Sequence, residues 1–363
     1  MKNNASKINL GQYYTPLKYI NIVDSWLVKY GITKEYMIAD LSCGDGRFLQ
    51  LPSYLSNQRV GNDIDKKAID DCIISDKTIS WFNKNSLLSV SRKDYGISET
   101  SPLVIVGNPP YNDTTSQSKM SIKKSVEMDK DIKSRDIGMS SMLAYNKLKA
   151  DYVAILHPLS YLIKETNFNI LKPFMSNYRI AEHVVFPSTE FDSVSTVSSF
   201  PILCILYKRS DGCGTTYKDI KQFKFTTLDD IQFSLSDYYY ITDYIQKYPH
   251  HKRYSKEILF YTLRDINALM RSKTFISKRC GNAVDVDPDK LSYYCYIDCF
   301  KHYAKVPYYL GNFNIPFKKE EFEALKQDIT IVSKFNNRHI FTDAITPTED
   351  QFETVENYFK QIF

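Results

Sequence analysis

Asp40-Leu41-Ser42-Cys43-Gly44-Asp45-Gly46 lies between a short apolar stretch, residues 37–39, and Arg47-Phe48-Leu49. This order predicts a buried strand, a tight loop and the start of a helix. Gly44 and Gly46 lack a Cβ, so the backbone can turn tightly there and approach a ligand closely. Amide groups at the start of the following helix favour a polar or anionic group. The stretch therefore predicts a ligand-binding loop at the carboxyl end of a strand.

Further apolar segments alternate with helical patterns along the first half of the chain. Continuous apolar runs among them are typical of buried parallel strands. This alternation predicts an α/β fold with a doubly wound, mostly parallel sheet that binds ligands at the carboxyl ends of its strands. The last two strands are expected to include an antiparallel hairpin element. After the strand at residues 37–39, the expected strands are residues 60–62, 103–106, 152–156, 181–186 and 202–207.

An acid at the end of the second expected strand indicates what the glycine loop binds. Asp63 follows Gly44 by 19 residues, a spacing that is used to hold a ribose diol. Leu49 occupies the place of the third small residue of a dinucleotide-binding GxGxxG loop. The loop therefore fits an adenosine-type ligand without a pyrophosphate better than a dinucleotide.

The tetrapeptide Asn108-Pro109-Pro110-Tyr111 ends the expected strand 103–106. Proline lacks an N–H group and fixes the backbone, so the Pro109 carbonyl and the Asn108 side-chain oxygen can act together as acceptors. Two such acceptors would orient an exocyclic amino group and raise the electron density on its nitrogen. The Tyr111 ring offers a face on which a base can stack. The loop therefore predicts chemistry on a planar amino group.

Residues 15–30 show the pattern of an amphipathic helix with both ends marked. Thr15 is a good N-cap and Pro16 suits the first helical position. Apolar residues then recur at helical spacing as far as Tyr30, and Gly31 follows them. We expect this helix to precede the sheet.

The 363 residues are enough for two domains. Residues 208–215, which contain Asp211-Gly212-Cys213-Gly214, are the expected linker. This places one domain at residues 1–210 and a second at 211–363. The second domain begins with aromatic-rich sequence that shows little periodicity. Within the first domain, the polar residues 112–137 are expected to form a mobile flap beside the ligand-binding loops.

Charge and cysteine content narrow the class of protein. The net charge of +5 is mild, but residues 252–279 contain eight basic and two acidic residues, which gives a local charge of +6. This segment could bind a polyanion, or it could form a solvated face of a helix. The seven cysteines are scattered without a zinc-type pair, so we expect no metal. Because the sequence lacks a membrane span or a signal peptide, we expect a cytoplasmic protein.

Five motifs in this order resemble the N6-adenine DNA methyltransferases of bacterial restriction-modification systems. They are Gly11-Gln12-Tyr13-Tyr14-Thr15-Pro16, residues 40–49, Gly61-Asn62-Asp63-Ile64-Asp65, Asn85-Ser86-Leu87 and Asn108 to Tyr111. The resemblance covers about the first 210 residues. It implies a seven-stranded methyltransferase sheet, S-adenosylmethionine as cofactor and a smaller C-terminal target-recognition domain. It also implies duplex DNA as substrate, an adenine flipped out of the duplex, and a separate cognate restriction endonuclease as partner.

The resemblance also assigns roles to individual residues. Asn108, Pro109, Pro110 and Tyr111 would be catalytic, and Tyr111 with Phe191 would stack on the target base, with Phe186 as a rival for Phe191. Asn85 stands where the family often has an acid beside the cofactor's adenine, and Ser42 where it often has proline. The residues that would contact the cofactor are Tyr14, Thr15, Asp40, Gly44, Gly46, Asp63 and Asn85.

The second domain would contact DNA through its local basic cluster. The candidates are Lys252, Arg253, Arg271, Lys273, Lys278 and Arg279. Two other enzyme classes share part of the pattern, namely RNA adenine or guanine methyltransferases and protein-glutamine N5 methyltransferases. The protein-glutamine enzymes have a helical N-terminal domain followed by a catalytic domain that ends the chain. The 153 residues that follow position 210 in this sequence do not fit that order. A scaffold protein with a degenerate site is a third alternative, which the intact motifs argue against.

Overall fold

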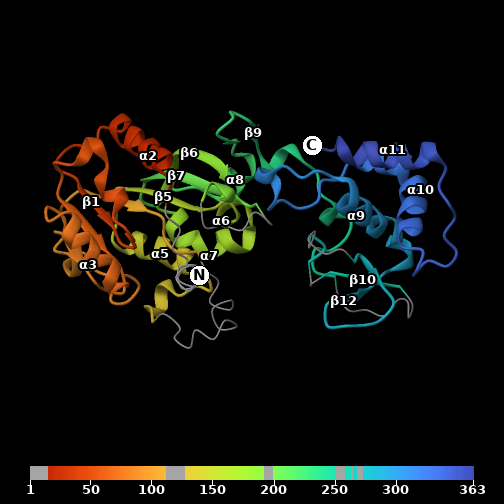
Figure 1. Cartoon of the computed structure of the whole chain (residues 1–363), viewed down its shortest axis with the longest axis horizontal. Helices are drawn as coiled ribbons and strands as arrows, with labels where there is room; N and C mark the ends of the chain where they lie inside the picture. Colours follow the sequence, from red (N-terminus) through yellow and green to blue (C-terminus); the bar gives the residue numbers. More distant parts are fainter. Residues whose placement is uncertain (1–14, 112–126, 192–198, 250–257, 263–264, 268–272) are drawn as a thin grey trace. The chain divides into compact units, whose positions relative to one another are not determined.

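The computed structural model describes residues 15–111, 127–191, 199–249, 258–262, 265–267 and 273–363. The chain forms two compact units, Met1–Leu235 and Ser236–Phe363, which are coloured from red to green and from green to blue in Figure 1. Each unit is described by itself below.

The first unit contains a seven-stranded sheet with the order β3-β2-β1-β4-β5-β7-β6. All neighbouring strands pair in parallel except β7, which is antiparallel to both β5 and β6. The doubly wound, mostly parallel sheet predicted from the sequence is therefore confirmed, including its antiparallel element. The strands are β1 (Met37–Asp40), β2 (Arg59–Asn62), β3 (Ser80–Phe82), β4 (Leu103–Gly107), β5 (Tyr152–Pro158), β6 (Tyr178–Pro187) and β7 (Pro201–Arg209).

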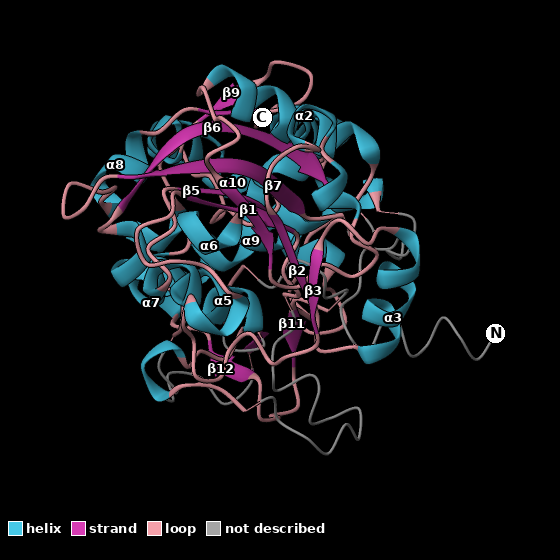
Figure 2. Cartoon of the chain, turned by 90° about the vertical axis from the view of Figure 1, so that its left-hand side faces the viewer, coloured by secondary structure: helices cyan, strands magenta, loops and turns pink. Residues whose placement is uncertain are grey.

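Helices cover both faces of this sheet. Figure 2 shows α2 (Leu17–Lys29) on one side of the sheet, and α5 (Ile137–Lys147), α6 (Ser160–Ile163) and α7 (Glu165–Met175) on the other. The strands β4 and β5 are buried along nearly their whole length, as their apolar sequences predict. Their side chains on one face join those of α2 and α3 (Lys66–Ser75) in a hydrophobic core.

The segment after the glycine loop differs from the helix that we expected. Two short 3₁₀ turns, Arg47–Gln50 and Pro52–Tyr54, stand there instead. Pro52 lacks the N–H group that would continue a helical ladder, so an α-helix that began at Arg47 would be interrupted at that point. The loop therefore lacks the helix dipole that a long helix would have supplied.

The start of α2 also differs from the expectation. Pro16 is the N-cap of this helix, and no side chain caps it. Thr15 lies one residue before the cap, and its hydroxyl oxygen accepts a hydrogen bond from Asn108 instead. The predicted helix is confirmed, but Thr15 does not serve as its cap.

The boundary between the units lies beyond the linker predicted at residues 208–215. That segment is a turn fixed within the first unit, because Thr215 N donates to Met175 O at 2.8 Å and Gly214 lies against the same carbonyl. The chain then adds α8 (Tyr217–Gln222) and a hairpin of β8 (Phe225–Thr226) and β9 (Gln232–Phe233) to this unit before Leu235.

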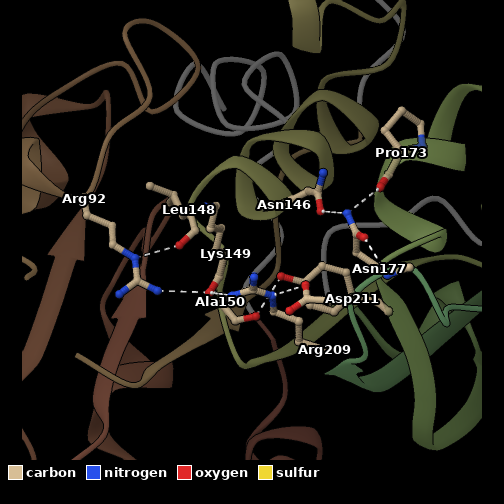
Figure 3. A network of polar contacts seen from close by, with 11 residues as sticks. Arg92, Asn146, Leu148, Lys149, Ala150, Pro173, Asn177, Arg209 and Asp211 are labelled. Carbon is tan, nitrogen blue, oxygen red and sulfur yellow. Dashed lines mark hydrogen bonds and ion pairs between the residues drawn. The ribbon is translucent and has the colours of Figure 1, made fainter. Parts of the chain in front are cut away.

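Arg92 holds the segment between α5 and β5, at the amino end of the strands (Figure 3). Its Nε donates to Leu148 O at 2.7 Å and its Nη2 to Lys149 O at 3.0 Å. Arg209 Nη1 donates to the same Lys149 carbonyl at 3.0 Å. These contacts supply partners for carbonyls at the carboxyl end of α5, which an α-helix leaves unsatisfied.

The second unit has an aromatic-rich core between a small sheet and three helices. The sheet is antiparallel with the order β11-β10-β12. The three helices were not predicted from the sequence. Of these, α9 is buried on most sides and shows no polar face. These elements are β10 (Leu259–Tyr261), β11 (Phe275–Ile276), β12 (Ala283–Asp285), α9 (Leu291–Tyr303), α10 (Lys319–Asn336) and α11 (Glu349–Lys360).

Candidate active site

The two loops singled out in the sequence meet at the point where the strand order of the sheet reverses. β1 lies between β2 and β4, and Ala39 pairs with Ile105, so β1 and β4 end side by side. In doubly wound sheets, ligands bind in the crevice at such a point. A Cβ on Gly107 would lie 2.7 Å from Oδ1 of Asp40. The absence of a side chain at Gly107 therefore allows the two loops to touch.

Asp63 joins the glycine loop to the loop after β2. Its Oδ2 accepts from Gly44 N and its Oδ1 from Asp65 N, both at 2.9 Å. Gly44 has a φ of +52°, and a Cβ placed on it would have no atom within 4 Å. The backbone at Gly44 is therefore open on the side where a side chain would project, which is the opening that a ligand needs.

Two buried carboxyl groups, those of Asp40 and Asp63, lie at this crevice. Asp40 is only 1% exposed, and burial raises the pKa of its carboxyl well above the ordinary value, although Ser42 N donates to its Oδ1 at 3.1 Å. Burial also raises the pKa of Asp63. Arg47 forms an ion pair with Asp45 and donates to Thr15 O at 2.8 Å. These groups suit a ligand with hydroxyl and cationic groups better than one with a phosphate.

Asn62 is a residue of this crevice that the sequence analysis did not single out. Its Nδ2 donates to the carbonyls of Leu41 and Lys84, each at 3.1 Å, and its Oδ1 accepts from Lys84 N at 3.0 Å. The side chain thus connects the loop after β1 with the loop after β3. An asparagine at the end of the expected strand 60–62, directly before Asp63, is the sequence signal that could have identified it.

The side chain of Asn85 takes part in local structure. Its Nδ2 donates to Glu127 O at 2.7 Å, and its Oδ1 accepts from Leu87 N at 3.1 Å. Both ends of the amide are engaged, so these bonds fix the loop after β3. Its expected contact with a cofactor stays a prediction.

The Asn108 amide is held at both ends. Its Nδ2 donates to Thr15 Oγ1 at 3.2 Å, and its Oδ1 accepts from the Tyr111 hydroxyl at 2.7 Å. Thr15 is buried and Asn108 half-buried. A carbonyl oxygen has two lone pairs, so Oδ1 can accept from a second donor while it keeps Tyr111. The structure thus brings together Thr15, Asn108 and Tyr111, which the sequence placed in two separate motifs.

The amino end of α5 supports the proline loop from behind. Asp136 caps this helix by accepting from Gly138 N at 2.9 Å, and it also accepts from the Tyr161 hydroxyl. A Cβ on Gly138 would lie 3.3 Å from the Pro110 carbonyl, so the helix start packs closely on the loop. Asp136, Gly138 and Tyr161 were not identified from the sequence, because they lie on elements distant from the motifs along the chain.

The remaining aromatic candidate, Phe191, lies in the hydrophobic core. It is 2% exposed, and its ring centroid is 5.8 Å from that of Phe186. His157 is also fully buried, where it bonds to the Tyr207 hydroxyl, and burial lowers its pKa to about 4. His157 is therefore part of the core rather than a base exposed to the crevice. The role of Phe191 in stacking stays a prediction.

Several predicted residues lie outside the described residues or belong to the second unit. Tyr14 and most of the expected flap, residues 112–126, lie outside the described residues, as do Lys252, Arg253 and Arg271. Lys273, Lys278 and Arg279 belong to the second unit. In the described part of the chain, no group of three or more His, Cys, Asp or Glu side chains could hold a metal ion. No helix there is long and apolar enough to cross a membrane.

Comparison with known proteins gives matches among solved structures alone. Neither a family model nor a curated protein sequence matches the chain. The similar structures include the methyltransferase subunit of a type I restriction-modification system from Streptococcus thermophilus, with 16% identity over 54% of this chain and 44% of that one, and a TM-score of 0.40. This chain thus spans less than half of that subunit.

Two further structures illustrate the range of the matches. One is a 23S rRNA methyltransferase, with 12% identity over 56% of this chain and 73% of that one, and a TM-score of 0.34. The other is a TehB-like S-adenosylmethionine-dependent methyltransferase from Corynebacterium glutamicum, with 14% identity over 52% of this chain and 88% of that one, and a TM-score of 0.32. The sheet of the first unit, with its antiparallel β7, is the seven-stranded sheet that the sequence resemblance implies.

Proposed function

We propose that this protein transfers a methyl group from S-adenosylmethionine to the N6 amino group of an adenine flipped out of duplex DNA. It would act as the modification enzyme of a restriction-modification system, beside a separate cognate nuclease. The observation that carries the proposal is the meeting of the Gly44 loop with the Asn108 loop at the adjoining ends of β1 and β4. A cofactor loop and an amine-orienting loop are then close enough for direct transfer.

The cofactor would lie against the open backbone of Gly44 and Gly46. Asp63 would bind its ribose hydroxyls, while Thr15 and Asp40 would face its methionine end, with Tyr14 as a further contact outside the described residues. S-adenosylmethionine supplies an electrophilic methyl group on a sulfonium ion. Burial raises the pKa of Asp40 and Asp63, and the positive charges of S-adenosylmethionine would favour the ionised form of both carboxyl groups.

The proline loop would orient the amine for attack. Asn108 Oδ1 and the Pro109 carbonyl accept from the two amino protons, which directs the nitrogen lone pair toward the methyl carbon. The new C–N bond would form as the S–C bond breaks, which would leave a thioether in place of the sulfonium. The methylated nitrogen then releases a proton to solvent. No base is required for the attack, in agreement with the burial of His157 in the core.

Flipping the base costs a few kcal/mol of stacking and pairing. The half-buried Tyr111 ring packs at the edge of the core, where a base stacked on it would recover about 1 to 3 kcal/mol. Phe191 would have to leave its packing on Phe186 to contact a base, so the proposal relies on Tyr111.

The substitution Asn108→Ala tests the proposal. It should abolish transfer of radiolabelled methyl groups to duplex DNA while calorimetry still detects binding of the cofactor. Asn357→Ala, on the exposed side of α11, is the matched control and should keep full activity. Retained turnover in Asn108→Ala would exclude the assigned chemistry. Transfer by the wild-type protein to structured RNA or to a protein glutamine, but not to DNA, would replace the substrate with one of the two alternatives.

A further inference from the structure

Arg47 links the glycine loop to the segment that precedes α2. Its Nη1 donates to the Thr15 carbonyl at 2.8 Å, and its Nε donates to Asp45 Oδ2 at 2.8 Å. One guanidinium contacts both groups because its planar fork carries donors on separate edges. Phe48 and Leu49, the next two residues, are buried in the core of the first unit. The backbone from which Arg47 projects is therefore fixed.

Thr15 is engaged at both of its oxygen atoms. Its carbonyl accepts from Arg47, and its hydroxyl oxygen accepts from Asn108 Nδ2 at 3.2 Å. Thr15 is 2% exposed, so water has little access to replace either donor. The other end of the Asn108 amide accepts from the Tyr111 hydroxyl at 2.7 Å. Arg47 is therefore joined to the Asn108 amide through a single residue.

The ion pair with Asp45 offsets the positive charge of Arg47. An isolated cation in this place would repel the sulfonium and ammonium groups of the proposed cofactor, whereas the ion pair has no net charge. Both side chains of the pair are 33% exposed, so the pair itself contributes little to stability. What Arg47 supplies is position, because it fixes the backbone of the residue whose hydroxyl holds Asn108.

We propose that Arg47 is a positioning residue that couples the glycine loop to the Asn108 amide through Thr15. The inference rests on the proposed function and adds a residue to it. Loss of the guanidinium would release the Thr15 carbonyl and weaken one of the two restraints on the amide. The Asn108 oxygen would then face the target amine for a smaller fraction of the time. This lowers kcat and leaves the affinity for the cofactor nearly unchanged.

A double-mutant cycle tests the coupling. Arg47→Met keeps most of the aliphatic length and removes the donors, and kcat on duplex DNA should fall about fivefold, the effect of one hydrogen bond. Calorimetry should give an affinity for S-adenosylhomocysteine within about twofold of the wild type. Thr15→Val removes the hydroxyl and keeps the carbonyl. In that variant Arg47 is already disconnected from Asn108, so adding Arg47→Met should lower kcat by less than about twofold.

A second measurement requires no substrate. Hydrogen exchange followed by mass spectrometry reports local opening of the segment 104–111, which contains the backbone amides of Asn108 and Tyr111. Arg47→Met and Thr15→Val should each raise its exchange rate by about fivefold. The double variant should exchange no faster than either single variant.

Arg209 provides the matched control because its contacts follow the same pattern. Its Nε donates to Asp211 Oδ1 at 2.6 Å, two residues away, and its Nη1 donates to the Lys149 carbonyl at 3.0 Å. It stands at the end of β7, beside the start of β5. Arg209→Met should leave kcat and the exchange of the segment 104–111 at their wild-type values. Thermal melting checks that every variant is folded.

The outcomes separate this inference from the proposed function. Equal losses of kcat on adding Arg47→Met to the wild type and to Thr15→Val would overturn the inference, because Arg47 would then act independently of Thr15. A large loss of cofactor affinity with unchanged kcat would also overturn it, since Arg47 would then be a cofactor ligand. If the wild-type chain does not methylate DNA, the proposed function is wrong. Hydrogen exchange still decides the coupling in that case, and unchanged exchange in Arg47→Met would refute it.

Discussion

The hydroxyl of Tyr111 donates a hydrogen bond to Oδ1 of Asn108 at 2.7 Å. The aromatic residue of the motif therefore has two separable roles, a ring face for a base and an O–H group that restrains the amide. The restraint is shared with Thr15, whose hydroxyl oxygen accepts from the other end of the amide at 3.2 Å. Substitutions that keep or remove the ring can distinguish the two roles.

Tyr111→Phe keeps the ring and removes the hydroxyl. One hydrogen bond contributes about 0.5 to 1.5 kcal/mol, so we expect kcat to fall about two- to tenfold with little change in DNA affinity. Tyr111→Ala should also weaken DNA binding, because stacking of one base contributes about 1 to 3 kcal/mol. Steady-state kinetics and anisotropy on both variants would check this order. Equal DNA affinity of the two variants would show that no base stacks on Tyr111.

Gly107→Ala should disrupt the contact between the two loops. The new Cβ would approach Asp40 Oδ1 to 2.7 Å, and the φ of +145° is unfavourable for alanine. Strain of this kind costs about 1 to 3 kcal/mol, so the melting temperature and the affinity for S-adenosylhomocysteine should both fall. Gly281→Ala, where an added Cβ meets no atom within 4 Å, is the control. Unchanged calorimetric binding in Gly107→Ala would contradict a shared site.

Arg92→Ala should destabilise the first unit without a direct effect on chemistry. Arg92 is buried and donates to the carbonyls of Leu148 and Ser101, which would lose this donor, whereas the Lys149 carbonyl would keep Arg209. An unsatisfied buried polar group costs about 1 to 3 kcal/mol, so urea unfolding should show a loss of roughly 3 kcal/mol. The neighbouring exposed Lys93→Ala should be neutral. A loss of specific activity in folded Arg92→Ala protein would contradict a purely structural role.

Lys301→Met should stabilise the second unit at neutral pH. The ammonium is buried over the Phe260 ring without a hydrogen-bond partner among the described residues, and burial lowers the pKa of Lys301 to about 8. Between pH 8 and 10.5, the ordinary pKa of a lysine, the unfolded chain binds more protons than the folded one, so wild-type stability should rise with pH.

The methionine variant should lack that rise and gain on the order of 2 kcal/mol at pH 7. Chemical unfolding at several pH values would measure both effects. A wild-type stability that stays flat across this pH range would show that Lys301 is not buried as a charge.

The sequence allowed the sheet to be predicted because its strands carry strong local signals. Apolar runs such as residues 103–106, followed by glycine, proline or acidic residues, mark both the strand and the end at which a ligand binds. The contact of Thr15 with Asn108 could not be predicted, since a threonine before a proline has the local signature of a helix cap. In the folded protein, the Thr15 hydroxyl accepts from Asn108 and does not cap the helix.

The second unit was harder to predict for a related reason. Helix α9 is buried on most sides, so it lacks the polar face that makes a helix recognisable in a sequence. The turn at Gly214 has the composition of a linker, yet its backbone bonds to β6 and α7 keep it in the first unit. Composition indicates that a segment turns, but it does not indicate what the turn packs against.

Helix α2 begins the described chain, yet it packs beside the last strands of the sheet. Tyr19 stacks on Phe186 with centroids 3.8 Å apart, and Lys18 and Lys29 form ion pairs with Glu190 and Glu182. The contacts that place Thr15 beside Asn108 therefore depend on where α2 lies, not on its rank in the polypeptide. A circularly permuted gene that encoded this helix after β7 would preserve the same neighbours, so the linear order of the motifs is open to rearrangement by evolution or by protein engineering.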